Sequence, residues 1–121
     1  MNNEMDDFSI KPGTPNAYGL VGSEANKIES RKSPLSSMSP TIVFKNSTPV
    51  LITGSQGGSM IINTVFQEIL NVLEFERKLS ESNKKKRVHY QWKQDIWFHE
   101  GLKKDLIEGL SEEMRLYERN I

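Results

Sequence analysis

The clearest pattern in the chain is the helical spacing of apolar side chains between Gly58 and Phe75. Apolar residues recur there every three or four positions, and polar residues fill the gaps. Several of the apolar residues are β-branched, which lowers helix propensity, so burial of the apolar face must hold the helix. We therefore predict a helix over residues 58–75. Its apolar positions are Ile61, Ile62, Val65, Phe66, Ile69, Leu70, Val72 and Leu73.

Two short apolar runs precede this helix. Residues 41–44 and 50–53 are rich in β-branched and aromatic side chains, and Asn46, Ser47 and Pro49 lie between them. Such runs, separated by turn-forming residues, are typical of a β-hairpin. Because the runs are apolar on both faces, we expect the strands to lie inside a sheet that is covered on two sides.

The two ends of the chain are less regular. Residues 1–40 are rich in Asn, Ser, Pro and Gly and follow neither the helix nor the strand period, so we expect loops. Near the other end we expect short strands at 88–92 and 96–98, and an amphipathic helix over about 103–119. We therefore divide the chain into loops at 1–40, a hairpin plus helix at 41–75, and a charged loop, short strands and a C-terminal helix at 76–121.

Length and composition indicate one modest domain. The chain has 121 residues, of which 36% are hydrophobic. Its 16 basic and 16 acidic side chains balance, so no overall field favours nucleic acid or an anionic membrane as a partner. The apolar runs are far shorter than the roughly 20 residues that span a bilayer, and the acidic N-terminal segment does not resemble a signal peptide. We therefore expect no nucleic-acid and no membrane partner.

The residue types that are missing exclude several kinds of chemistry. The sequence contains no cysteine, which excludes disulfides, thiolate nucleophiles and cysteine-based zinc sites. The two histidines, His89 and His99, lie near no carboxylate pair with a ligand spacing, so we expect no metal and no cofactor. We also find no Ser-His-Asp arrangement and no phosphate-binding loop.

Gly57 and Gly58 lie between the second predicted strand and the helix. The first backbone N–H groups of a helix lack intrahelical acceptors, and the helix dipole presents its positive end there. Such a junction can bind a carboxylate or an oxyanion, and glycine permits the close approach. From this motif alone, a plain strand-to-helix turn with Ser59 as its cap is the favoured interpretation.

Two loops in residues 1–40 carry groups that suit the two ends of an amino acid. Ser36 and Ser37 lie between prolines and offer hydroxyls to a carboxylate. Glu4 and Asp7 belong to an acidic loop and offer counter-charges to an ammonium, which is costly to desolvate unpaired. The alternatives are a flexible Ser-Pro linker and a solvated acidic terminus.

A basic run at residues 84–87 precedes several aromatic side chains, an arrangement found on nucleic-acid-binding surfaces. Because the net charge is zero, we favour a solvated loop and aromatic residues in the core.

In their order and residue identities, these segments resemble the small subunit of gamma-glutamyltranspeptidases, also called glutathione hydrolases, which are N-terminal nucleophile hydrolases. The resemblance extends from Asn2 to Trp92. The segments that carry it are Asn2 to Ser9, Lys11 to Gly13, Pro15 to Leu20, Pro34 to Val43, Thr53 to Ser55, Gly57 to Ser59 and Arg87 to Trp92.

The resemblance implies a fold, an activity and a site. The fold is an α+β fragment of the family's αββα sandwich, and we expect it to be incomplete as given. The implied reaction transfers the γ-glutamyl group of amides such as glutathione to water or to an amino-acid acceptor. The resemblance assigns the substrate α-amino group to Glu4 and Asp7, the α-carboxylate to Ser36 and Ser37, and the oxyanion hole to Gly57 and Gly58.

The chain also departs from the family's pattern. The family's nucleophilic threonine lies upstream of Asn2, and no threonine of this chain matches it. We therefore expect a truncated chain that is inactive alone and needs a large subunit or a missing upstream half. Gln56 replaces a proline and Met60 an arginine. The alternative is a non-catalytic protein that retains a γ-glutamyl-binding pocket or a packing surface. The compartment stays open, although family members are often periplasmic, secreted or surface-exposed.

Overall fold

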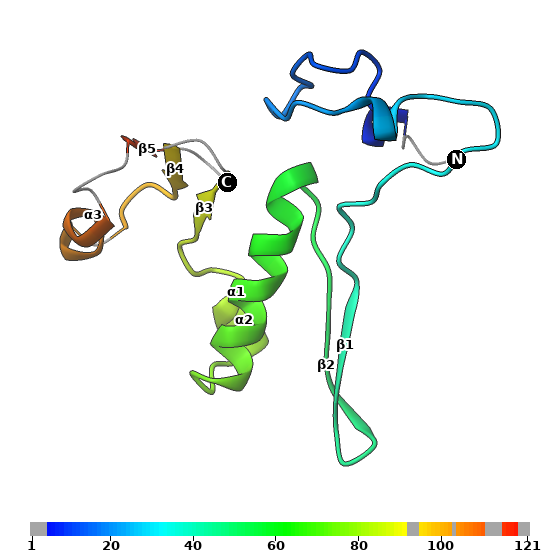
Figure 1. Ribbon diagram of the computed structural model, residues 1–121. Coiled ribbons are helices and arrows are strands. Elements are labelled where there is room, and N and C mark those ends of the chain that lie inside the picture. Colours follow the sequence, from blue (N-terminus) through cyan, green and yellow to red (C-terminus); the bar gives the residue numbers. More distant parts are fainter. Residues whose placement is uncertain (1–4, 92–94, 103, 111–114, 119–121) are drawn as a thin grey trace. The chain divides into compact units, whose positions relative to one another are not determined.

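The structure is a computed structural model that describes residues 5–91, 95–102, 104–110 and 115–118 (Figure 1). The chain forms two compact units, Met1–Met38 and Ser39–Ile121. The helices are η1 (Met5–Asp7), η2 (Glu24–Asn26), η3 (Gly58–Met60), α1 (Ile61–Leu73), α2 (Leu79–Ser82) and α3 (Lys104–Leu110), where η marks a 3-10 turn. The strands are β1 (Thr41–Lys45), β2 (Thr48–Thr53), β3 (Val88–Tyr90), β4 (Asp95–Phe98) and β5 (Arg115–Glu118).

The first unit consists of loops that backbone hydrogen bonds tie together. The N–H of Ser9 donates to the carbonyl of Asn26 at 2.9 Å, and the N–H of Gly13 donates to the carbonyl of Gly22 at 2.9 Å. Its regular elements within the described residues are the 3-10 turns η1 and η2. The expected loop character of this part is therefore confirmed.

The predicted hairpin is confirmed as the antiparallel pair β1 and β2. Asn46 and Ser47, which join the strands, have φ values of 49° and 64°. Positive φ at both positions is the geometry of the two-residue turns that suit twisted hairpins. The register shifts between Val43 and Phe44, close to Pro49, whose nitrogen has no hydrogen to donate to the ladder.

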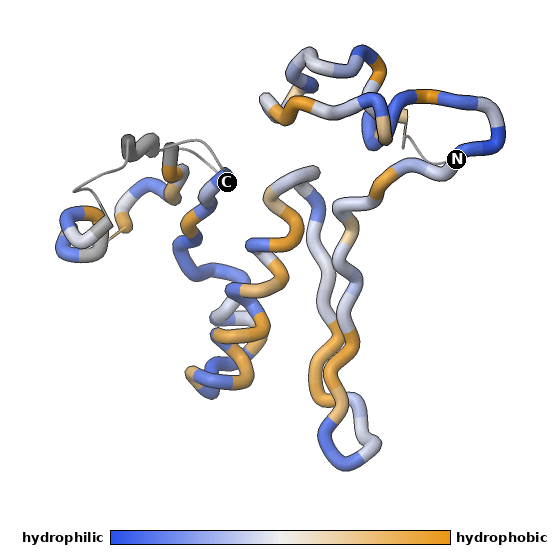
Figure 2. The backbone as a smooth tube through the Cα atoms, in the orientation of Figure 1, coloured by the Kyte–Doolittle hydropathy of each residue, from blue (hydrophilic) through white to orange (hydrophobic). Residues whose placement is uncertain are grey.

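The hairpin differs from expectation in how its faces are covered. Leu51 is buried, whereas Ile42, Phe44 and Ile52 are exposed. Figure 2 shows that apolar residues gather on the hairpin and on α1. Because the two strands pair with one another and α1 approaches one side, the expected cover on two sides is not met within the described part of the chain.

The predicted helix at 58–75 is confirmed as η3 followed by α1, but the face that it buries is mixed. Ile61 and Val65 are buried together with Glu68, whereas Ile62 and Phe66 are exposed. The helix therefore turns a partly polar side toward the rest of its unit.

A polar stripe on α1 and the turn before it explains this orientation. The stripe consists of Ser59, Asn63, Gln67 and Asn71, which are four residues apart and so lie on one side of the helix. The Gln67 side chain donates to the carbonyl of Val88 at 2.8 Å and accepts from the N–H of Val88 at 3.1 Å. These two hydrogen bonds attach α1 to β3.

The strands predicted near 88–92 and 96–98 are confirmed as β3 and β4, which pair antiparallel. The prediction of one helix over about 103–119 is wrong at Arg115–Glu118. The chain there forms β5, which pairs in parallel with β4 and thereby satisfies backbone groups through the ladder. Gly109, a poor helix former, lies in the last turn of α3 and favours an early end.

The short helix α2 was not predicted, since the charged segment from 76 to 87 was expected to be a loop. With four residues, α2 is too short to show a helical period in the sequence.

We expect Gly22→Ala to destabilise the first unit. A Cβ at this position would lie 1.9 Å from Ser9 Oγ and 2.8 Å from Ser9 Cβ, and such overpacking typically costs about 1–3 kcal/mol. Amide hydrogen exchange at Ser9 and Gly13 should therefore accelerate. The matched control is the double variant with Ser9→Gly, which removes both clashing atoms and should restore slow exchange. Unchanged exchange in Gly22→Ala would contradict the close approach.

Candidate functional site

The turn formed by Gly57 and Gly58 has an unusual backbone. Gly57 has φ 125° and Gly58 has φ 56°, both in the left-handed region that favours glycine. The N–H of Met60 donates to the carbonyl of Gly57 at 3.1 Å and closes the turn. Within the described residues, the N–H groups of the two glycines donate to no acceptor. Two adjacent N–H groups are thus available to an anion.

Ser59 does not cap the helix, so the alternative of a simple turn capped by this residue is wrong. The N-cap of η3 is Gly57 and that of α1 is Met60, and neither makes a side-chain cap hydrogen bond. The Ser59 hydroxyl instead donates to Gln91 Oε1 at 2.6 Å. Gln91, which directly follows β3, therefore holds Ser59, the residue after the two glycines.

His89 continues this chain of hydrogen bonds. Its Nε2 lies 3.3 Å from Gln91 Oε1, and its Nδ1 lies 3.1 Å from Asn63 Nδ2. The imidazole is buried, and its ring centroid lies 5.4 Å from that of Trp97 at an angle of 42°. The sequence indicates no metal-binding role for His89, and the structure places it in this network.

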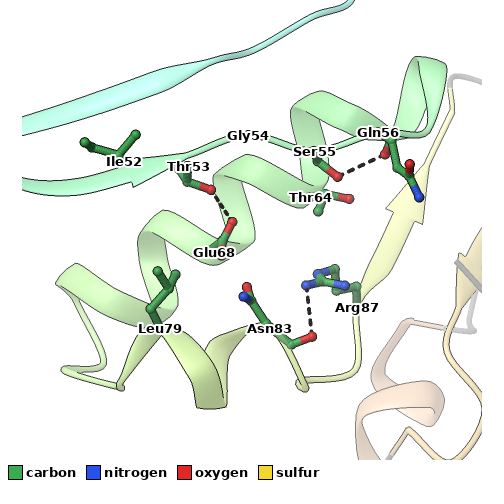
Figure 3. A pocket seen from close by; sticks show the side chains of 10 residues that line it. All are labelled: Ile52, Thr53, Gly54, Ser55, Gln56, Thr64, Glu68, Leu79, Asn83 and Arg87. Carbon is green, nitrogen blue, oxygen red and sulfur yellow. Dashed lines mark hydrogen bonds between the residues drawn. The ribbon is translucent and has the colours of Figure 1, made fainter.

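A hollow of about 770 Å³ lies beside the segment that leads into the glycine turn (Figure 3). Glu68, a buried carboxylate on α1, accepts a hydrogen bond there from the Thr53 hydroxyl. Across the hollow, the Arg87 guanidinium donates to the carbonyl of Asn83 at 3.3 Å. Gln56 also lines the hollow.

The other predicted site residues belong to the first unit. Asp7 ends η1 and is half-buried. Ser36 is exposed, and its Oγ accepts a hydrogen bond from the N–H of Met38 at 3.2 Å. Ser37 follows it and is half-buried. Glu4 lies outside the described residues. The first unit thus carries Asp7 and both serines, and the second carries both glycines.

Asn26 connects the two loops of the first unit and was missed in the sequence. Its Nδ2 donates to the carbonyl of Asp7 at 2.6 Å, and its Oδ1 accepts from the N–H of Leu35 at 3.2 Å. One side-chain amide therefore links the acidic turn to the residue directly before Ser36. No sequence spacing indicates this role, because the partners are 19 and 9 positions away.

Surface ion pairs follow η2. A hydrogen bond to Glu24 and its charge raise the pKa of Lys27, to which Glu29 adds a smaller effect. A hydrogen bond from Lys32, together with its charge, lowers the pKa of Glu29. These groups are solvent-exposed, so salt screens their attraction. Both lysines are paired with carboxylates rather than held ready for a substrate carboxylate.

Metal ligands and membrane-spanning helices were sought in the described ranges. There, no three His, Asp or Glu side chains gather closely enough to hold a metal ion. In the same ranges, no helix has the length and apolar character needed to cross a membrane.

Comparison with known proteins gives consistent matches along the chain. The family model described as Gamma-glutamyltranspeptidase matches residues 1–119. The glutathione hydrolase proenzyme of Escherichia coli (strain K12) is 53% identical over 95 residues, which cover 78% of this chain and 16% of that protein. The proenzyme of Bacillus subtilis (strain 168) is 36% identical over 111 residues, which cover 92% of this chain and 17% of that protein. This chain therefore spans about a sixth of these curated relatives.

Solved structures agree with the sequence matches. The T380A mutant of Helicobacter pylori gamma-glutamyltranspeptidase matches with a TM-score of 0.92 and 48% identity, over 100% of this chain and 67% of that chain. The Pseudomonas nitroreducens gamma-glutamyltranspeptidase complexed with L-DON matches with a TM-score of 0.86 and 40% identity, over 99% of this chain and 65% of that chain. The predicted α+β fragment of an N-terminal nucleophile hydrolase fold is thereby confirmed.

We expect Asn26→Asp to loosen the link between η1 and the serine loop. The change replaces the donor to the Asp7 carbonyl with a carboxylate oxygen, and the loss of a part-buried hydrogen bond of this kind costs about 0.5–1.5 kcal/mol. Amide exchange at Ser9, whose N–H donates to the Asn26 carbonyl, should accelerate about tenfold. Asn16→Asp is the matched control, because Asn16 Oδ1 accepts from Tyr18 and Leu20 and aspartate can do the same. Equal effects of the two variants would refute the link.

Proposed function

This chain belongs to the gamma-glutamyltranspeptidase family, and we propose that it supplies substrate-binding loops and an oxyanion hole to an enzyme that hydrolyses or transfers γ-glutamyl amides such as glutathione. The observation that carries the proposal is the turn at Gly57 and Gly58, whose N–H groups make no hydrogen bond within the described residues. Two fixed donors of this kind suit an oxygen that gains negative charge during acyl transfer.

The chemistry needs these donors at one step. When a nucleophile attacks the γ-glutamyl carbonyl carbon, the C=O double bond becomes a single bond and the oxygen becomes an oxyanion. The N–H groups of Gly57 and Gly58 donate to that oxygen and stabilise the tetrahedral intermediate. Fixed donors need no reorganisation as the charge develops, and the loss of one donor in comparable sites costs about 2.7–4 kcal/mol.

The loops of the first unit suit the glutamyl end of the substrate. In this proposal, the carboxylates of Glu4 and Asp7 bind the α-ammonium, and the hydroxyls of Ser36 and Ser37 donate to the α-carboxylate. Hydrogen bonds to charged groups are stronger than neutral ones, so two such contacts select a free amino acid end. The Asn26 link supports the proposal, because it couples the acidic turn to the serine loop.

The proposal includes a partner for the reaction. The family's nucleophile is a threonine, and none of the chain's threonines matches its position. Two of them have their hydroxyls engaged, since Thr53 donates to Glu68 and Thr41 donates to the carbonyl of Ser39. We propose that a large subunit and the segment with the threonine come from sequence outside these 121 residues.

The chain alone should not release the leaving group from a γ-glutamyl anilide. A chimera in which this chain replaces the matching part of the Helicobacter pylori enzyme should release the leaving group. The match covers 100% of this chain and 67% of that chain. The release is followed by absorbance of the free aniline. Turnover by the chain alone would contradict the need for a partner. A chimera that folds but is inactive would favour the non-catalytic alternative. Calorimetry with glutathione would then test whether a γ-glutamyl-binding pocket is retained.

In the active chimera, Gly57→Ala should lower kcat by about 100-fold to 1,000-fold, as for the loss of an oxyanion donor. The φ of 125° strains any residue with a Cβ, so the turn must change. Gly54→Ala is the matched control, because a Cβ there meets no atom within 4 Å and its φ is not in the left-handed region. Similar kcat values for both variants would argue against an oxyanion hole at this turn.

A further inference from the structure

The two glycines do not by themselves fix the conformation of the turn that they form. Glycine adopts many backbone conformations, so Gly57 and Gly58 gain their unusual φ values at the expense of stiffness. An oxyanion hole works through donors whose positions are fixed before the reaction. The turn therefore needs an anchor outside the two glycines.

Ser59 is the first residue after the turn with a side chain, and that side chain is held. Its hydroxyl donates to Gln91 Oε1 at 2.6 Å, across 32 positions of sequence. Met60, the next residue, packs near Gly57, since a Cβ on Gly57 would lie 3.6 Å from Met60 Cβ. The hydroxyl bond is the polar link between the turn and the segment after β3.

His89 in turn contacts Gln91, and its two ring contacts indicate one tautomer. Gln91 Oε1 is a carbonyl oxygen and can only accept, so His89 Nε2 carries the proton of the 3.3 Å contact. Asn63 Nδ2 can only donate, so His89 Nδ1 accepts in the 3.1 Å contact. Both contacts are thus satisfied by the tautomer with its proton on Nε2.

The position of His89 makes it a rigid anchor. The side chain is 4% exposed and packs against the Trp97 ring. Its neighbour Val88 is fixed to α1 by both hydrogen bonds of the Gln67 side chain. The imidazole is therefore held from β3, from the helix and from β4.

We propose that His89 is a positioning residue that fixes the Gly57–Gly58 turn through Gln91 and Ser59. It touches no substrate, and its Nε2-protonated tautomer donates to the Gln91 carbonyl oxygen that also accepts the Ser59 hydroxyl hydrogen bond. That the anchored turn serves an oxyanion rests on the proposed function. The anchoring itself does not, so the two are tested by different measurements.

The first test measures the anchor in the full chain without any reaction. Ser59→Ala removes one link and should accelerate amide exchange about tenfold at Met60, whose N–H closes the turn on the Gly57 carbonyl, whereas Ser59→Thr keeps the hydroxyl and should restore slow exchange. Nitrogen-15 NMR of the imidazole should find the proton on Nε2 of His89. Unchanged exchange in Ser59→Ala, or a proton on Nδ1, would overturn the proposal even if the chain never shows turnover.

The second test separates positioning from simple stability in the active chimera. Ser59→Ala and His89→Phe, which retains an aromatic ring against Trp97, should lower kcat about tenfold with little change in KM. Asn71→Ala is the matched control, because Asn71 belongs to the same polar stripe but donates to the carbonyl of Gln67, away from the turn. The control should leave kcat unchanged, and an equal loss in all three variants would overturn the proposal.

The two failures are distinguishable. If the wild-type chimera has no turnover while exchange responds to Ser59→Ala, the proposed function fails and the anchor stands. If turnover is present but Ser59→Ala changes neither kcat nor exchange, the anchoring role is refuted and the proposed function stands. If His89→Phe does not fold, the Ser59 pair still decides the outcome.

Discussion

The second unit depends on the hydrogen bonds between α1 and β3. The Gln67 side chain satisfies both the N–H and the carbonyl of Val88, as a neighbouring strand would. Buried polar groups are costly when unpaired, so this arrangement allows one register of the helix against the strand. A shift of α1 by one residue would replace Gln67 with Phe66 or Glu68 and leave Val88 without these partners. Apolar packing alone would tolerate such a shift more easily.

The elements found from the sequence are those with local causes. The hairpin follows from two β-branched runs and from Asn46, a residue type that tolerates the positive φ of the turn. The helix at 58–73 follows from its period, which does not depend on what the helix packs against. The candidate glycines were found for the same reason, since they stand at a junction that adjacent residues define.

What the sequence did not predict depends on residues far apart in the chain. The buried side of α1 includes Glu68, because Thr53 on β2 supplies a hydrogen bond. The strand β5 depends on pairing with β4, which a periodic pattern of apolar residues does not reveal. In the sequence, Asn26 does not differ from other polar loop residues, because its partners Asp7 and Leu35 are distant along the chain.

The glycine turn shows how these local and distant causes combine. Local sequence selects glycine, because a φ of 125° excludes residues with a side chain. The same freedom would leave the turn loosely defined if nothing else held it. The constraint enters through Ser59, the first side chain after the glycines, and comes from Gln91 and the buried His89. Glycine thus permits the conformation, and a hydrogen-bonded histidine in the sheet specifies it.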